Sequence, residues 1–142
     1  MGQFMMAEKM EETYDQHVEI EVDDRIIEKL EMGKQGVIFF ISEEAVNNAR
    51  KHAKASLIQV RLRSLERSII VLEIKDNGRG FDVKAVHENY EERGSLGMVN
   101  LKERAELING LLHIDSAPKQ GTNVQVFIPL SEEAADRLHR SK

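Results

Sequence analysis

The chain has no cysteine among its 142 residues. This absence excludes a disulfide framework, thiolate catalysis and a zinc site built on cysteine. Long apolar runs are missing as well. The longest, residues 37–41, has five residues and is far too short to span a membrane. The N-terminus carries neither the basic region nor the apolar stretch of a secretory signal peptide. We therefore expect a cytoplasmic domain that makes no direct membrane contact.

An excess of basic charge is also lacking. The chain has 20 Lys and Arg against 25 Asp and Glu, and its net charge is −5. This balance argues against nucleic acid as a partner. The length suits one compact domain with a real core. We expect a flexible lead-in over residues 1–13, one domain over residues 14–130, and a polar tail over residues 131–142 that could form a helix.

Hydrophobic periodicity predicts an alternation of strands and helices. Apolar and polar residues alternate over residues 17–22, which predicts a half-buried strand. Asp23 or Asp24 can cap a helix that runs to about Gln35. Further helices are expected over residues 36–53 and 98–109, and hairpins over residues 57–65 with 68–75 and over 111–116 with 122–130. This layout predicts an α/β (α+β) two-layer sandwich with an antiparallel or mixed sheet and helices on one face.

Three clusters of residues are typical of chemistry rather than packing. The first is Glu44, Asn48 and His52, with Lys51, on the expected helix over residues 36–53. Positions i, i+4 and i+8 share one helix face. An amide oxygen suits Mg²⁺ beside phosphates, a carboxylate can act as a base, and Lys and His can balance phosphate charge. The alternative is an ordinary amphipathic helix with a solvated polar face.

The second cluster is the run Asp76-Asn77-Gly78-Arg79-Gly80-Phe81, which directly follows a strand. Two glycines let a ligand approach the backbone closely, and the aspartate can accept a hydrogen bond from an exocyclic amine. The alternative is a simple hairpin turn, because Asn-Gly favours such turns.

The third cluster is Gly94-Ser95-Leu96-Gly97-Met98, at the start of a helix. Free N–H groups and the positive end of the helix dipole make such a position receptive to phosphate. The alternative is a plain glycine-containing loop before a helix.

Taken in order, these clusters and the pair Gly121-Thr122 resemble the N, G1 and G2 boxes and the closing Gly-Thr of the GHKL ATPase superfamily. That superfamily includes gyrase, Hsp90-type chaperones, histidine kinases and mismatch-repair ATPases. The ending Lys51-His52-Ala53 and the run over residues 98–107 look most like sensor histidine kinases that partner helix-turn-helix response regulators.

The resemblance implies the Bergerat ATP-binding fold, with a mixed, mostly antiparallel sheet and helices on one face. It also implies a role for each matched residue. Glu44 would stand where the family's general base stands, and Asn48 would ligate a Mg²⁺ that bridges the ATP phosphates. Lys51 and His52 would lie near the phosphates. Asp76 would accept from the adenine amino group, Gly78 and Gly80 would make room for the base, and Thr122 would support the adenine end. The run Gly94, Ser95, Leu96, Gly97, Met98 would border the phosphates, with a lid over ATP between residues 81 and 94.

The implied function is transfer of the ATP γ-phosphoryl group to a histidine on a dimerisation domain. That domain would precede Met1 in a parent kinase, which could be membrane-anchored, and a response regulator would take the phosphoryl group onward. The isolated chain would be monomeric and would autophosphorylate poorly. Two alternatives stand beside this one: a stand-alone anti-sigma-factor serine kinase, and a non-catalytic interaction module on the same fold.

Overall fold

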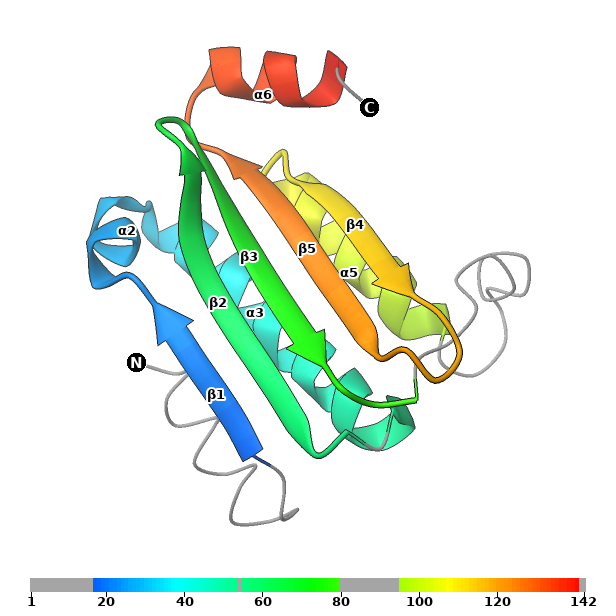
Figure 1. Cartoon of the computed structure of the whole chain (residues 1–142). Coiled ribbons are helices and arrows are strands. Elements are labelled where there is room, and N and C mark those ends of the chain that lie inside the picture. Colours follow the sequence, from blue (N-terminus) through cyan, green and yellow to red (C-terminus); the bar gives the residue numbers. More distant parts are fainter. Residues whose placement is uncertain (1–16, 54, 80–94, 141–142) are drawn as a thin grey trace.

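A computed structural model describes residues 17–53, 55–79 and 95–140 of the chain (Figure 1). The expected lead-in over residues 1–13, the expected lid, and Gly80 and Gly94 lie outside the described residues. The strands are β1 (His17–Val22), β2 (Leu57–Glu66), β3 (Ile69–Asp76), β4 (Leu111–Ser116) and β5 (Thr122–Pro129). The helices are α2 (Asp24–Lys29), α3 (Met32–Asn48), the π-helix η1 (Ala49–Ala53), α5 (Ser95–Leu107) and α6 (Glu132–Arg140).

The strands form one mixed sheet in the order β1-β2-β3-β5-β4. β1 pairs with β2 in parallel, and the other three pairs are antiparallel. Both expected hairpins are present, as β2 with β3 and as β4 with β5. The predicted mixed, mostly antiparallel sheet is therefore confirmed.

The helices α3 and α5 lie side by side against one face of the sheet, so the molecule has the two predicted layers (Figure 1). Apolar side chains of the two helices and of alternate strand positions meet between the layers, where burial of apolar surface drives folding. The fully or almost fully buried members of this core include Ile38, Ile41, Val46, Ile58, Val60, Leu62, Leu72, Leu101, Ala105 and Val126.

The prediction of one helix from Asp23 to about Gln35 is wrong, because α2 ends at Lys29 and α3 begins at Met32. Asp23 caps α2 as expected, and its carboxylate accepts from the backbone N–H of Arg25. Leu30 then takes an extended conformation and is buried. The Gln35 side chain donates to the carbonyl oxygens of Ile27 and Leu30 at 3.0 and 2.9 Å. It therefore satisfies backbone groups that a continuous helix would have paired internally.

The expected α-helix over residues 36–53 differs at both ends. It begins earlier, at Met32, and after Asn48 it continues as the π-helix η1 rather than as an α-helix. Such π-helical turns are rare and are often found at functional sites. The helix expected over residues 98–109 also begins earlier, at Ser95, and ends at Leu107. Asn109 follows with a φ of 56° just before Gly110.

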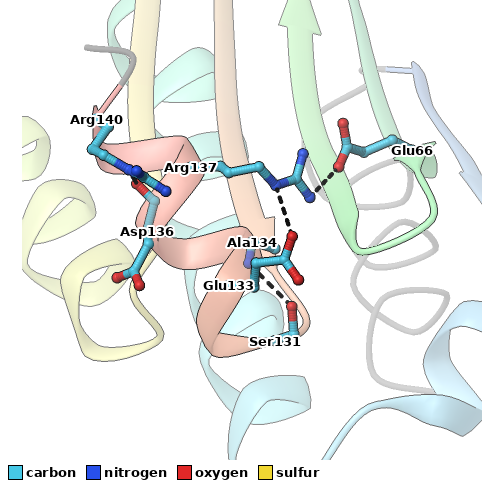
Figure 2. A network of polar contacts seen from close by, with 7 residues as sticks. All are labelled: Glu66, Ser131, Glu133, Ala134, Asp136, Arg137 and Arg140. Carbon is cyan, nitrogen blue, oxygen red and sulfur yellow. Dashed lines mark hydrogen bonds and ion pairs between the residues drawn. The ribbon is translucent and has the colours of Figure 1, made fainter.

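The polar tail folds into the helix α6 across the end of the sheet where β5 finishes (Figure 1). The Ser131 hydroxyl oxygen accepts from the backbone N–H of Ala134, which caps the helix. Ala134 is completely buried. Arg137 donates to the Glu66 carboxylate at the end of β2, at 2.7 Å (Figure 2). The tail is therefore packed on the domain over residues 132–140.

Candidate functional site

The described segments that carry the three sequence clusters gather at one end of the molecule. The carboxyl end of β3, the amino end of β5 and the amino end of α5 all point to this end, and η1 reaches it from α3 (Figure 1). α6 lies at the opposite end. Segments far apart in the sequence are thus brought together by the way the sheet and its two large helices are connected.

Asp76 is the centre of the described part of the site. It is the last residue of β3 and is 8% exposed. One carboxylate oxygen accepts from the backbone N–H of Gly78 at 2.8 Å. Burial raises the pKa of the Asp76 carboxyl above its ordinary value, while hydrogen bonds from the backbone N–H groups of Gly78 and Thr122 act in the opposite direction. The structure therefore holds a buried carboxylate in a fixed orientation at the end of a strand.

The turn between β4 and β5 closes against the backbone of the Asp76 loop. Gly121 has a φ of +76°, and a Cβ atom there would collide with the carbonyl oxygen of Asp76. The backbone N–H of Lys119 donates to the carbonyl oxygen of Arg79. Gly121 is thus required both for its left-handed conformation and for the close approach of two backbones.

Thr122 lies directly across from Asp76 in the β3–β5 register and across from Ser116 in the β4–β5 register. The hydroxyl oxygens of Ser116 and Thr122 are 2.8 Å apart, and the Ser116 hydroxyl donates to the Gly121 carbonyl at 3.0 Å. A pocket opens beside this group and is lined by Lys75, Asp76, Asp115, Ser116, Ala117, Gln120, Gly121, Thr122 and Asn123.

The contribution of Ser116 and of the turn residues was not predicted from the sequence. Ser116 joins Thr122 and Asp76 only because β5 lies between β3 and β4. The alternation of apolar residues in each strand shows which side chains share a face, but it does not give the order of the strands. The pair Gly121-Thr122 was the one signal for this side of the pocket.

The helix cluster is divided between two kinds of helix. Glu44 and Asn48 are both on α3, one helical turn apart, and both are partly exposed. Lys51 is exposed on η1. The His52 side chain lies outside what the structure describes. The backbone from Ala49 to Ala53 is π-helical, so the regular α-helical spacing used to predict the stripe applies to Glu44 and Asn48 and ends there.

The third cluster lies where a phosphate-receptive helix start was expected. Ser95, Leu96, Gly97 and Met98 form the first turn of α5. The backbone N–H groups of a first helical turn have no partner within the helix and lie at the positive end of its dipole. The start of α5 therefore offers the backbone N–H groups on which that prediction depends.

No helix within the described ranges is long and apolar enough to cross a membrane. The same ranges contain no group of three or more His, Asp or Glu side chains arranged to hold a metal ion. A Mg²⁺ site here would need ligands from a bound phosphate chain and water as well as from Asn48, which is the usual way in which proteins hold Mg²⁺ with substrate phosphates.

Comparison with known proteins agrees with this geometry. A sensor-like histidine kinase of Chloroflexus aurantiacus, described as uncharacterized, is 45% identical over 73% of this chain and 18% of that protein. The signal transduction histidine-protein kinase/phosphatase DegS of Brevibacillus brevis is 35% identical over 94% of this chain and 34% of its own length. The chain thus spans about a third or less of these relatives.

Solved structures show the same fold. The blue-light activated histidine kinase of Erythrobacter litoralis matches with a TM-score of 0.70 and 22% identity, over 92% of this chain and 41% of that one. The ATP binding domain of PrrB from Mycobacterium tuberculosis matches with a TM-score of 0.65 and 22% identity, over 88% of both chains. Residues 33–132 match the family model described as histidine kinase-, DNA gyrase B- and HSP90-like ATPase. The chain belongs to this ATPase family.

Proposed function

We propose that this chain is the Mg-ATP-binding catalytic domain of a sensor histidine kinase. It would transfer the ATP γ-phosphoryl group to a histidine on a dimerisation domain, from which a response regulator would receive it. The observation that carries the proposal is the buried Asp76 carboxylate at the wall of a pocket, held by the backbone N–H groups of Gly78 and Thr122. The names of the relatives favour a histidine kinase over a serine kinase.

The residues around Asp76 fit an adenine ring. An ionised carboxylate can accept hydrogen bonds but cannot donate them, so its natural partner is the exocyclic amine of the base. Gly78 on one side and Gly121 on the other present no side chain. Thr122 adds a hydroxyl group that is already oriented by Ser116. Adenine would therefore be selected by one charged acceptor and fixed by the surrounding backbone.

The phosphates would lie between η1 and the amino end of α5. The backbone N–H groups of Ser95 to Met98 would face them, and Lys51 and His52 would balance their charge. Gly80 and Gly94 belong to this proposal through the sequence pattern alone. Asn48 would contribute one oxygen to Mg²⁺, which would neutralise negative charge on the phosphates when bound. Catalysis of this kind depends mainly on positioning and charge stabilisation.

Glu44 is the candidate base. It lies one helical turn before Asn48 and is partly exposed, so an incoming histidine could reach it. Its carboxylate could accept a proton from the attacking imidazole or orient the ring. Glu44→Gln tests this role, since it should lower the rate of phosphoryl transfer while leaving the affinity for Mg-ATP within about twofold.

Titration calorimetry of Mg-ATP into the purified chain tests the proposal, with Asp76→Asn measured beside it. We expect binding by the wild-type chain and a loss of affinity of about 100-fold or more in the variant, because an amide NH₂ group would face the exocyclic amine. Equal affinities for the two chains would contradict the proposed adenine site. Absence of binding by the folded wild-type chain would favour a non-catalytic module.

A further inference from the structure

Asn77 is the residue between Asp76 and Gly78, and its side chain points away from the Asp76 carboxylate's partners to a different segment. Its amide oxygen accepts from the backbone N–H groups of Ser56 and Leu57, both at 3.0 Å. Its amide NH₂ group donates to the Ser56 hydroxyl, also at 3.0 Å. Its own backbone N–H donates to the Leu57 carbonyl at 3.3 Å.

This arrangement joins two parts of the site that are far apart in the sequence. Ser56 and Leu57 lead into β2 directly after η1, which carries Lys51 and follows Asn48. Asn77 itself lies next to Asp76. The side-chain bonds of Asn77 therefore connect the loop proposed to bind adenine with the start of β2, which follows the helix η1 that is proposed to lie near the phosphates.

We propose that Asn77 is a positioning residue that holds the adenine end and the phosphate end of the site at a fixed separation. The inference rests on the proposed function, because it takes Asp76 and Asn48 as the two ends of a bound ATP. It implies that a ligand spanning both ends depends on Asn77 more than a ligand that occupies the adenine end alone.

The chemistry requires an amide at this position. The oxygen must accept two backbone N–H groups, and the nitrogen must donate to a hydroxyl. Aspartate keeps the acceptor, and alanine keeps neither. All of these side-chain bonds are exposed to solvent. Water can therefore replace them when the side chain is removed, so the segment should loosen without unfolding the domain.

Asp76 has a second anchor that does not depend on Asn77. The β4–β5 turn packs against it through Gly121, and Lys119 bonds to the Arg79 carbonyl. Removing the Asn77 side chain should therefore leave the adenine acceptor in place. It should free the backbone N–H groups of Ser56 and Leu57 from their side-chain acceptor, while the backbone bond from Asn77 to the Leu57 carbonyl and the pairing of Asp76 with Ile58 remain. This asymmetry makes the inference testable.

The experiment compares Asn77→Ala with wild type by NMR titration of adenosine and of Mg-ATP into the full chain. We expect the affinity for Mg-ATP to fall about tenfold and the affinity for adenosine to change by less than about twofold. Gln59→Ala is the matched control, because it too removes an exposed side-chain amide that makes a 3.0 Å hydrogen bond. Gln59 lies on β2, and its amide donates to the Glu19 carboxylate. It should change neither affinity.

Hydrogen exchange in the ligand-free chain gives a second readout that does not depend on nucleotide. In Asn77→Ala the amides of Ser56 and Leu57 should exchange faster while the amides in the middle of β3 stay protected. Asn77→Asp should restore protection of Ser56 and Leu57, since it keeps the acceptor oxygen.

The possible failures are distinguishable. Equal loss of affinity for adenosine and Mg-ATP in Asn77→Ala, or no loss of either, would overturn the positioning role while Asp76→Asn still supports the adenine site. Binding of Mg-ATP that is indifferent to Asp76→Asn would overturn the proposed function and this inference together.

Discussion

At the scale of single residues, the burial of the Asp76 carboxylate should have a measurable effect on how the free energy of unfolding depends on pH. Its carboxylate is buried, and burial raises the pKa of that carboxyl above 3.8. Asp23 is the opposite case at the surface, where hydrogen bonds from Arg25 lower the pKa of the carboxyl below 3.8. The contributions of these two aspartates to the free energy of unfolding should therefore change in opposite directions as the pH rises.

We predict that the stability advantage of wild type over Asp76→Asn falls as the pH rises from below 3.8 through the raised pKa. The folded chain retains this proton where the unfolded chain has released it, so raising the pH favours unfolding over that interval and not above it. Urea denaturation at a series of pH values measures the difference in the free energy of unfolding.

Asp23→Asn is the control for that experiment. In the wild-type chain the Asp23 carboxyl releases its proton at a lower pH in the folded state than in the unfolded state. The stability advantage of wild type over Asp23→Asn should therefore grow as the pH rises from the lowered pKa to 3.8. Asn also caps helices well, so α2 should persist. Curves of the same sign for both variants would contradict the assignment of causes to the two pKa shifts.

Of the glycines compared in the described part of the chain, Gly121 combines a positive φ with the closest approach to another backbone atom. Gly121→Ala should destabilise the fold by at least about 1–2 kcal/mol, because an L-residue is strained at positive φ and its Cβ would collide with the Asp76 carbonyl. Gly36→Ala is the control. It lies inside α3 with open space around the added atom and should be stabilising by about 0.5–1 kcal/mol. Thermal denaturation of both variants checks the pair, and a neutral Gly121→Ala would show that the turn can move.

At the scale of elements, α6 is an addition at the end of the sheet away from the proposed nucleotide site. The ion pair of Arg137 with Glu66 is partly exposed on both sides and should contribute no more than about 1 kcal/mol. Burial of Ala134 is the stronger attachment. The helix therefore depends on one small apolar contact face more than on its charges.

We predict that Ala134→Asp detaches α6 and lowers the free energy of unfolding by about 2 kcal/mol or more, because it would bury an unpaired charge. Ala135 is the next residue and is partly exposed. Ala135→Asp should therefore lower the free energy of unfolding by less than half as much. Hydrogen exchange of the α6 amides and urea denaturation measure both effects. Affinity for Mg-ATP should stay within about twofold in either variant, and a larger change would connect α6 to the site.

At the scale of the whole molecule, the described surface offers little for self-association. Its exposed large apolar side chains are Met32, Phe40, Leu65, Leu107 and Leu130. Met32 and Phe40 lie on α3, and the other three lie on β2, on α5 and just after β5. The Arg104 guanidinium covers the Phe40 ring at 4.3 Å from its centroid. A stable dimer interface buries about 800 Å² per partner, so scattered residues of this kind are poor candidates for one.

We therefore predict that the isolated chain is monomeric at micromolar concentrations and phosphorylates itself poorly. Solution scattering with light scattering measures the mass, and a radiolabelled phosphate assay measures the transfer. A stable dimer would contradict this prediction and would point to an interface outside the described residues or to a contact between these apolar side chains.

The sequence by itself determined which segments are strands, that the sheet is mixed and mostly antiparallel, and which residue types stand at the candidate site. These properties follow from the alternation of apolar residues and from local patterns such as Asp76 to Gly78 followed later by Gly121-Thr122. The ends of the helices were harder to predict from the sequence. The break at Leu30 depends on burial of that side chain in the core, which is not a local property. It also depends on a hydrogen bond from the Gln35 amide, five residues further along the chain, which hydrophobic periodicity does not reveal.

Only the tertiary structure decided the composition of the pocket and the contact between the Asp76 loop and the start of β2. Ser116 meets Thr122 because β5 lies between β3 and β4, and strand order is set by packing of the whole sheet rather than by any one strand. Asn77 holds Ser56 and Leu57, a contact between segments about 20 residues apart. In the sequence Asn77 is simply part of a favourable turn, and the same two letters would have fitted an isolated hairpin equally well.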